Sequence, residues 1–116
     1  MKYLYLLYAD ESKMPAPNSP QFQQQEAAFG KYYEELSGRG MFKAGDPVQP
    51  SKTATTVRVR NGSTKTVSGP ATSGSEQLIG FYVVEAKNQD EAVAYAAKIP
   101  SATVGSIEVR PIIGSS

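Results

Sequence analysis

Two segments of the sequence, residues 2–8 and 77–86, alternate as β-strands do but are apolar or aromatic on both sides. The first has two faces, made of Tyr3, Tyr5 and Leu7 and of Leu4, Leu6 and Tyr8. The second is expected to have faces made of Leu78, Tyr82 and Val84 and of Ile79, Phe81 and Val83. Strands of this kind need cover on both sides in water, which restricts the fold more than any other feature of the chain.

The other segments predict an α+β domain. A helix is expected from Ser19-Pro20 to Ser37, and a second from an Asn88 cap to Pro100, with shorter strands between and after them. Strands are expected at residues 53–60, 64–67 and 106–113, and residues 41–50 are expected to form a short strand that leads into a turn or bulge. Asn61-Gly62 predicts a hairpin turn, and Gly80 predicts a bulge or a close backbone approach.

This order, β-α-β-β-β-β-α-β, predicts a ferredoxin-like antiparallel sheet with two helices on one face and an inserted β-hairpin. In the hairpin, Val57 and Val59 are expected to point inward, and Arg58 and Arg60 outward. The 116 residues fit one domain, expected over residues 1–113, with a short C-terminal tail at 114–116.

Two helices can cover only one face of such a sheet, so the second apolar face needs another cover. The simplest is a second copy of the chain, and we expect a two-fold homodimer with the sheets face to face. The alternative is that the long loops of the same chain fold over that face.

Composition excludes several classes of function. The chain has no His and no Cys, which rules out Ser-His-Asp and Cys-His catalysis and leaves Asp, Glu, Lys or Tyr for proton transfer. Its net charge of +1 gives no field for nucleic acid or an anionic membrane, and no apolar run reaches the roughly 20 residues of a membrane helix. We expect a cytoplasmic protein with no cofactor and no metal site.

Five stretches taken together resemble the YCII-related family, in its DGPF-domain branch: "KYLYLLYADE", "TATTVRVRNG", "SGP" with "EQLIGFYVVEA", "DEAVAYAAKIP" and "SIEVRPI". The resemblance covers residues 2 to 113. It implies a bacterial protein with the dimeric α+β barrel form of the ferredoxin-like fold.

The resemblance also shows what this chain lacks. The branch is named for an Asp-Gly-Pro-Phe motif, and the matching positions here are Ser68-Gly69-Pro70-Ala71. Related proteins carry a proposed catalytic pair, a His on the first helix and the Asp of this motif. Neither is present, so that chemistry cannot be transferred to this chain.

The candidate site residues are polar groups at strand ends. Tyr8, Asp10 and Glu11 match a Tyr-x-Asp-Glu of the family, and a carboxylate beside a phenol can bind a polar ligand or move a proton. The predicted catalytic pair is Asp10 and Tyr8, and the predicted ligand-binding residues are Glu11, Asp46, Ser68, Glu76 and Arg110. Each of these residues can also have a purely structural role, as a carboxylate that caps a turn, as a solvated charge or as a member of an ion pair.

Three functions remain open at this point. The chain would bind a small polar or aromatic molecule in a cleft between sheet, helix and partner chain, with or without weak lyase- or isomerase-type acid–base activity. Alternatively, it is a non-catalytic binding or regulatory module that kept the fold and lost the His/Asp pair. A purely structural dimer is the third reading.

Overall fold

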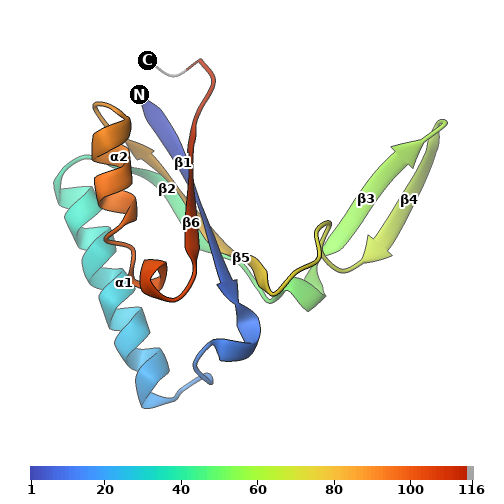
Figure 1. Cartoon of the computed structure of the whole chain (residues 1–116), viewed down its shortest axis with the longest axis horizontal. Coiled ribbons are helices and arrows are strands. Elements are labelled where there is room, and N and C mark those ends of the chain that lie inside the picture. Colours follow the sequence, from blue (N-terminus) through green and yellow to red (C-terminus); the bar gives the residue numbers. More distant parts are fainter. Residues whose placement is uncertain (115–116) are drawn as a thin grey trace.

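A computed structural model describes residues 1–114 as one α+β fold (Figure 1). Of the expected tail at 114–116, only Gly114 lies within the described residues. The helices and strands, in chain order, are β1 (Lys2–Asp10), α1 (Pro20–Gly38), β2 (Phe42–Pro47), β3 (Thr55–Arg60), β4 (Ser63–Ser68), β5 (Glu76–Glu85), α2 (Gln89–Ala96) and β6 (Ser106–Pro111). Short 3-10 helices occupy Glu11–Lys13, Ser51–Thr53 and Pro100–Thr103.

Four strands form an antiparallel sheet in the order β2-β5-β1-β6, and both helices lie on one of its faces (Figure 1). The expected α+β, ferredoxin-like arrangement with an inserted hairpin is therefore confirmed. Within residues 1–114, neither helix combines the length and the apolar character needed to cross a bilayer.

Local sequence signals set the ends of the two helices. The Ser19 hydroxyl accepts a hydrogen bond from the Phe22 N–H at 3.1 Å. Pro20 lies in the first turn, where a backbone N–H has no partner within the helix, so the N–H that proline lacks costs no hydrogen bond. Asn88 caps α2 in the same way, accepting from the Glu91 N–H at 2.9 Å. These are the caps that the sequence predicts.

The core lies between the helices and the sheet. Its buried residues come mainly from β1, α1 and the α2 region: Tyr3, Tyr5, Leu7, Tyr32, Leu36, Met41, Val84, Ala86, Ala92, Ala96 and Ile99. Two buried phenols are satisfied by helix carbonyls, because Tyr5 donates to the Ala92 carbonyl and Tyr32 donates to the Tyr95 carbonyl at 2.9 Å.

A β-bulge in β5 corrects the expected faces of that strand. The pairing with β1 runs Leu7 with Gly80 and then Tyr8 with Leu78, so Ile79 is an extra residue. Directly opposite residues share a face, so Leu78 lies with Tyr8 and not with Tyr82 as expected. Ile79 packs against the core instead.

Gly80 also explains how β2 approaches the bulge. A Cβ at Gly80 would lie 3.2 Å from the Asp46 carbonyl oxygen and 3.3 Å from the Pro47 Cα. A glycine here therefore allows the end of β2 to come close to β5, which confirms the close backbone approach expected at Gly80, while the bulge itself lies at the neighbouring Ile79.

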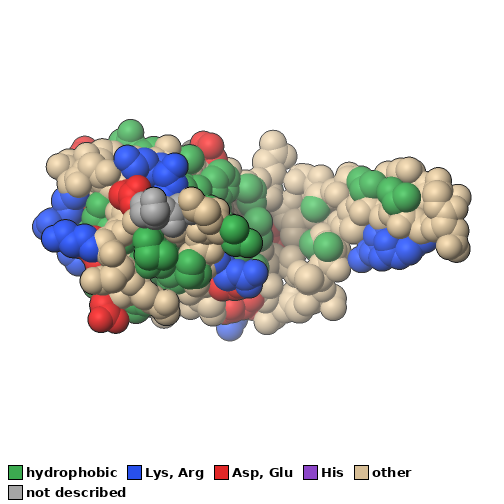
Figure 2. Space-filling model, turned by 90° about the horizontal axis from the view of Figure 1, so that it is seen from above, with side chains coloured by type: hydrophobic (Ala, Val, Ile, Leu, Met, Phe, Trp, Pro, Cys, Tyr) green, Lys and Arg blue, Asp and Glu red, His purple; other side chains and the backbone are tan. Residues whose placement is uncertain are grey.

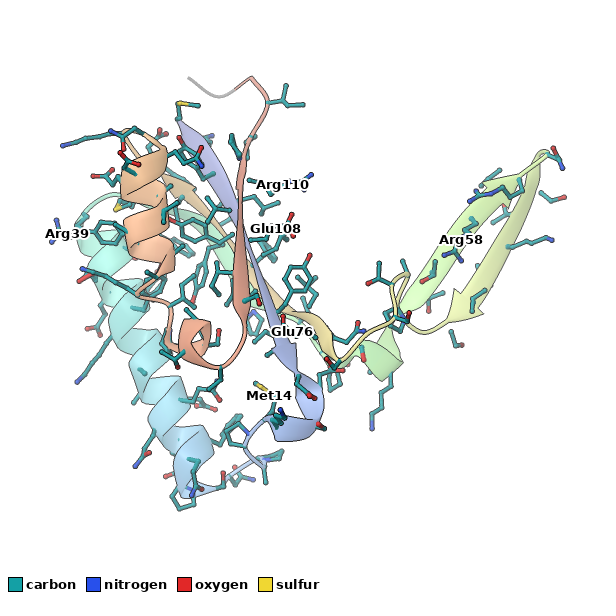
Figure 3. All side chains as sticks on the ribbon, in the orientation of Figure 1. Met14, Arg39, Arg58, Glu76, Glu108 and Arg110 are labelled. Atoms are coloured by element: carbon teal, nitrogen blue, oxygen red, sulfur yellow. The ribbon has the colours of Figure 1, made fainter. Side chains whose placement is uncertain are left out.

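The face of the sheet opposite the helices, here called the outer face, has no covering element within the described residues. Its apolar side chains are half-buried or exposed, and they alternate with the core positions along β1 and β5: Leu4, Leu6, Tyr8, Leu78, Phe81 and Val83. Glu108 and Arg110 of β6 point to the same side, away from the helices (Figure 3). The loops of the described chain do not fold over this face, and the β3–β4 hairpin projects away from it (Figure 1).

Candidate functional site

A half-open pocket of about 810 Å³ lies between α1 and the β2–β5 side of the sheet. Its volume falls in the range of small-molecule sites. Its aromatic walls come from the inner face of α1 and from β2 and β5: Phe22, Phe29, Tyr33, Phe42 and Tyr82. We refer to this space as the aromatic pocket.

The rings on one side of the aromatic pocket hold each other in place. Tyr33 and Phe42 meet edge to face, with their ring centroids 4.8 Å apart. Tyr82 forms the same kind of contact with buried Tyr32, at 5.4 Å. Such pairs add about 0.5–1.5 kcal/mol beyond area burial, so these rings form a wall that exists before a ligand arrives.

Gly45 makes room for this wall. A Cβ at Gly45 would lie 2.7 Å from the Cδ1 of Tyr82 and 3.2 Å from the Cε2 of Phe42. Only a residue without a side chain allows both rings to lie against β2 at this point.

Four charged residues line the aromatic pocket: Glu11, Glu26, Asp46 and Lys52, of which Asp46 pairs with Phe81 at the end of β2. Three are acidic and one is basic, so the pocket has an acidic character. Within residues 1–114 no group of acidic side chains is arranged to hold a metal ion.

Glu11 is fixed by the loop that follows β2. Its carboxylate accepts hydrogen bonds from the Ser51 N–H at 2.8 Å and from the Ser51 hydroxyl. These hydrogen bonds hold the pKa of Glu11 below its usual range. The contact ties the 3-10 helix after β1 to the one before β3, and it keeps an ionised carboxylate at the edge of the pocket.

Of the seven predicted site residues, the structure brings Glu11 and Asp46 together in the aromatic pocket. Tyr8 lies on the outer face of the sheet. Asp10 is the cap of the following 3-10 helix, where it accepts from the Ser12 N–H at 3.0 Å and the Ser12 hydroxyl at 2.6 Å. These hydrogen bonds lower the pKa of Asp10.

The other three predicted ligand-binding residues also lie outside the pocket. Glu76 accepts from the Ser106 hydroxyl at 2.8 Å, across the β5 and β6 ends of the outer face. Arg110 donates to its neighbour Glu108 at 2.8 Å, in an exposed ion pair (Figure 3). Ser68 is exposed at the end of β4, opposite Thr55.

The Gly-Pro turn closes the base of the hairpin. Gly69 has a positive φ of 114°, its N–H donates to the Ala54 carbonyl at 2.7 Å, and its own carbonyl accepts from the Thr56 hydroxyl at 2.8 Å. Residues 69–75, between β4 and β5, therefore connect the hairpin to the main sheet, and they do not line the aromatic pocket.

Glu26 and Lys52 were not predicted as site residues. Glu26 had a readable signal, because it lies four residues after Phe22 and three before Phe29 and so interrupts the apolar face of α1 with a charge. No sequence signal marked Lys52, because its position beside the pocket depends on how the chain after β2 folds.

Comparisons with known proteins agree with the fold. The model of the YCII-related domain matches residues 1–115. A relative from Rhizobium meliloti (strain 1021), described as the uncharacterized protein R00369, is 30% identical over 114 residues, covering 97% of this chain and 92% of its own length.

A solved structure has a similar fold. It is the 5-chloro-2-hydroxyhydroquinone dehydrochlorinase TftG from Burkholderia phenoliruptrix AC1100, in complex with 2,5-dihydroxybenzoquinone. The TM-score is 0.54 at 18% sequence identity, over 99% of this chain and 96% of that one. At this identity the likeness shows the fold alone.

Proposed function

The chain belongs to the YCII-related family, and we propose that it binds a small aromatic molecule in the aromatic pocket. The observation that carries the proposal is the pocket's lining, in which preformed aromatic walls surround a space of about 810 Å³ with a few charged groups at its edge. Sites for small organic molecules have this composition. The distant structural relative TftG, which holds an aromatic-derived quinone, is consistent with it.

The charges of the pocket favour one class of aromatic ligand. Glu11, Glu26 and Asp46 outnumber Lys52, so an anionic ligand would meet net repulsion. A neutral phenol or an arylalkyl amine such as benzylamine would meet none, and the amine, which is protonated at neutral pH, would gain from the carboxylates and from the faces of the rings. The proposed ligand is therefore a small aromatic compound that is neutral or positively charged.

Binding without acid–base catalysis is the reading that the carboxylates support. A general acid or base works best with a pKa near the operating pH. The hydrogen bonds from Ser12 and Ser51 move the pKa values of Asp10 and Glu11 away from neutrality. This favours a binding module that lacks the family's His/Asp pair over a lyase or isomerase.

We also propose that the outer face is covered by a second copy of the chain. Leu4, Leu6, Phe81 and Val83 form an apolar surface with no cover within the described residues. Soluble monomers rarely expose a contiguous apolar surface of this kind. A two-fold pairing of outer faces would bury it and leave the aromatic pocket, on the helix side, open to ligands.

The binding test compares three probes: benzylamine, phenol and 2,5-dihydroxybenzoquinone. Isothermal titration should give the tightest binding for benzylamine and the weakest for the anionic quinone. Glu26→Gln removes a pocket charge, and we expect it to weaken benzylamine binding about fivefold, since a charge interaction of about 1 kcal/mol is lost. Glu34→Gln is the matched control, because Glu34 is an exposed residue of the same helix that does not line the pocket.

A second control separates the aromatic pocket from the strand-end site around Asp10. Asp10→Asn should leave probe binding unchanged, because Asp10 caps the following turn and does not line the pocket. If Asp10→Asn abolishes binding while Glu26→Gln does not, the ligand lies at the strand end. If none of the three probes binds, the proposed function is wrong.

A further inference from the structure

The β3–β4 hairpin is separated from the rest of the molecule. It forms its own two-stranded sheet, and in Figure 1 it stands apart on the side of the β2-β5-β1-β6 sheet that the helices leave open. The chain accordingly has a radius of gyration of 16.0 Å. A compact domain of this length would have about 13 Å.

The hairpin has an apolar face that stays exposed within the described residues. Val57 pairs with Thr66 and Val59 with Thr64, so both valines share one side of the ribbon. Their side chains are 58% and 57% exposed. The alternation along β3 predicts that these valines point inward, but both are exposed among residues 1–114, so that expectation is wrong for the single chain.

The opposite side of the hairpin is basic. Arg58 pairs with Lys65, and Arg60 lies on the same side. Figure 2 shows apolar and basic side chains on different sides of the arm. Residues 47–75 contain no Asp or Glu, so all 11 acidic residues of the chain lie outside this segment.

We propose that the hairpin is an intersubunit arm, whose Val57–Val59 face packs on the body of a second copy of this chain. An isolated two-stranded hairpin is marginally stable in water, and among the described residues this one pairs with no strand of the main sheet. It stands on the same side as the outer face, so a copy that covers the outer face lies within its reach.

Charge complementarity favours a second copy as the occupant. All charged residues of the segment 47–75 are basic, whereas the rest of the chain holds 11 acidic and 8 basic residues and is net acidic, so arm and body of two different copies attract each other. The valine face supplies apolar area to bury, and the basic face supplies the charge that steers the arm toward the partner's acidic body.

The test uses single-cysteine variants, because the chain has no native Cys. Val59→Cys reports on the arm, and Val104→Cys is the matched control, since Val104 is 73% exposed and lies outside the arm. Each variant is reacted with a maleimide over a range of protein concentrations, and sedimentation velocity gives the fraction of dimer in the same samples.

We expect the Val59→Cys variant to react about tenfold more slowly than the Val104→Cys variant where the dimer dominates, and at an equal rate after dilution to monomer. Two results would overturn the proposal: equal rates in samples that are dimeric, or a chain that stays monomeric at every concentration tested.

A second pair of variants keeps the test independent of labelling. Val57→Asp, on an exposed position, should leave the far-UV circular dichroism unchanged and weaken dimerisation about tenfold or more. Val104→Asp should change neither. Full dimerisation by Val57→Asp would contradict the intersubunit arm, even if the outer face pairs as proposed.

Discussion

The two faces of the β2-β5-β1-β6 sheet have similar apolar compositions but different surroundings. On the helix side, Tyr5, Leu7 and Val84 are fully enclosed by α1 and α2. On the outer face, Leu6 and Val83 remain half-buried with no covering element in the described chain. Packing within one chain therefore explains the apolar residues on the helix side of the sheet. The apolar residues of the outer face remain available for association with another molecule.

The polar groups on the two faces differ in the same way. On the helix side, the phenols of Tyr5 and Tyr32 donate to helix carbonyls inside the core. On the outer side, polar contacts such as Glu76 to Ser106 and Arg110 to Glu108 are exposed at the sheet margin. The first set stabilises the fold, and the second surrounds an apolar surface as the polar rim of an interface does.

Leu6 and Leu7 are neighbours of the same type on opposite faces, so they give a matched comparison. Leu7→Ala should lower the free energy of unfolding by about 2–5 kcal/mol, because it leaves a cavity in a packed core. Leu6→Ala should cost about 1 kcal/mol or less in the monomer, since its side chain is only half-buried there. Chemical denaturation at low protein concentration measures both, and equal losses would show that the two faces do not differ in this way.

Leu6 should matter more for association than for folding. Leu6→Asp places a charge in the proposed outer-face contact, and we expect it to weaken dimerisation by about 100-fold or more. Sedimentation equilibrium measures the change, with Val104→Asp as the control on a surface outside both the sheet and the arm. A Leu6→Asp protein that dimerises like the unmodified chain would place the interface elsewhere.

Alkaline pH should lower the free energy of unfolding through the tyrosines buried on the helix side of the sheet. Burial raises the pKa of Tyr5 and Tyr32 above the ordinary tyrosine value of about 10. Because their folded pKa values are raised, their contribution to stability is complete below about pH 10 and is lost as the pH rises above it. Tyrosine absorbance near 295 nm, recorded with circular dichroism, should show these two groups ionising only as the protein unfolds; ionisation in a folded protein would contradict their burial.

The element order could be predicted from sequence because its signals are local. Ser19-Pro20 and Asn88 mark helix starts, and Asn61-Gly62 marks a hairpin, each through bonds made within a few residues. The bulge at Ile79 could not be read in this way, because strand register depends on the partner strand. The expected faces of β5 were therefore wrong at Leu78 and Ile79.

The site was predictable only in part for the same reason. Glu11 and Asp46 were both expected near a cleft, and both line the aromatic pocket. The contact between Glu11 and Ser51, which spans 40 residues of sequence, could not be foreseen from spacing. Tyr8 and Asp10 lie two residues apart in β1, so they share one face of the sheet. That face is the outer one, and neither residue lines the pocket. Their roles, with those of Ser68, Glu76 and Arg110, stay predictions.

We propose that the two faces of the sheet serve different partners, with an aromatic molecule bound on the helix side and a second copy of the chain on the outer side. Two-dimensional ¹H–¹⁵N NMR during a benzylamine titration tests it most directly. The account predicts chemical-shift changes at α1 and β2 residues that line the pocket, such as Glu26, Phe29 and Asp46, and none at Leu4 and Leu6. Changes concentrated on Leu4, Leu6 and Val83 would contradict it.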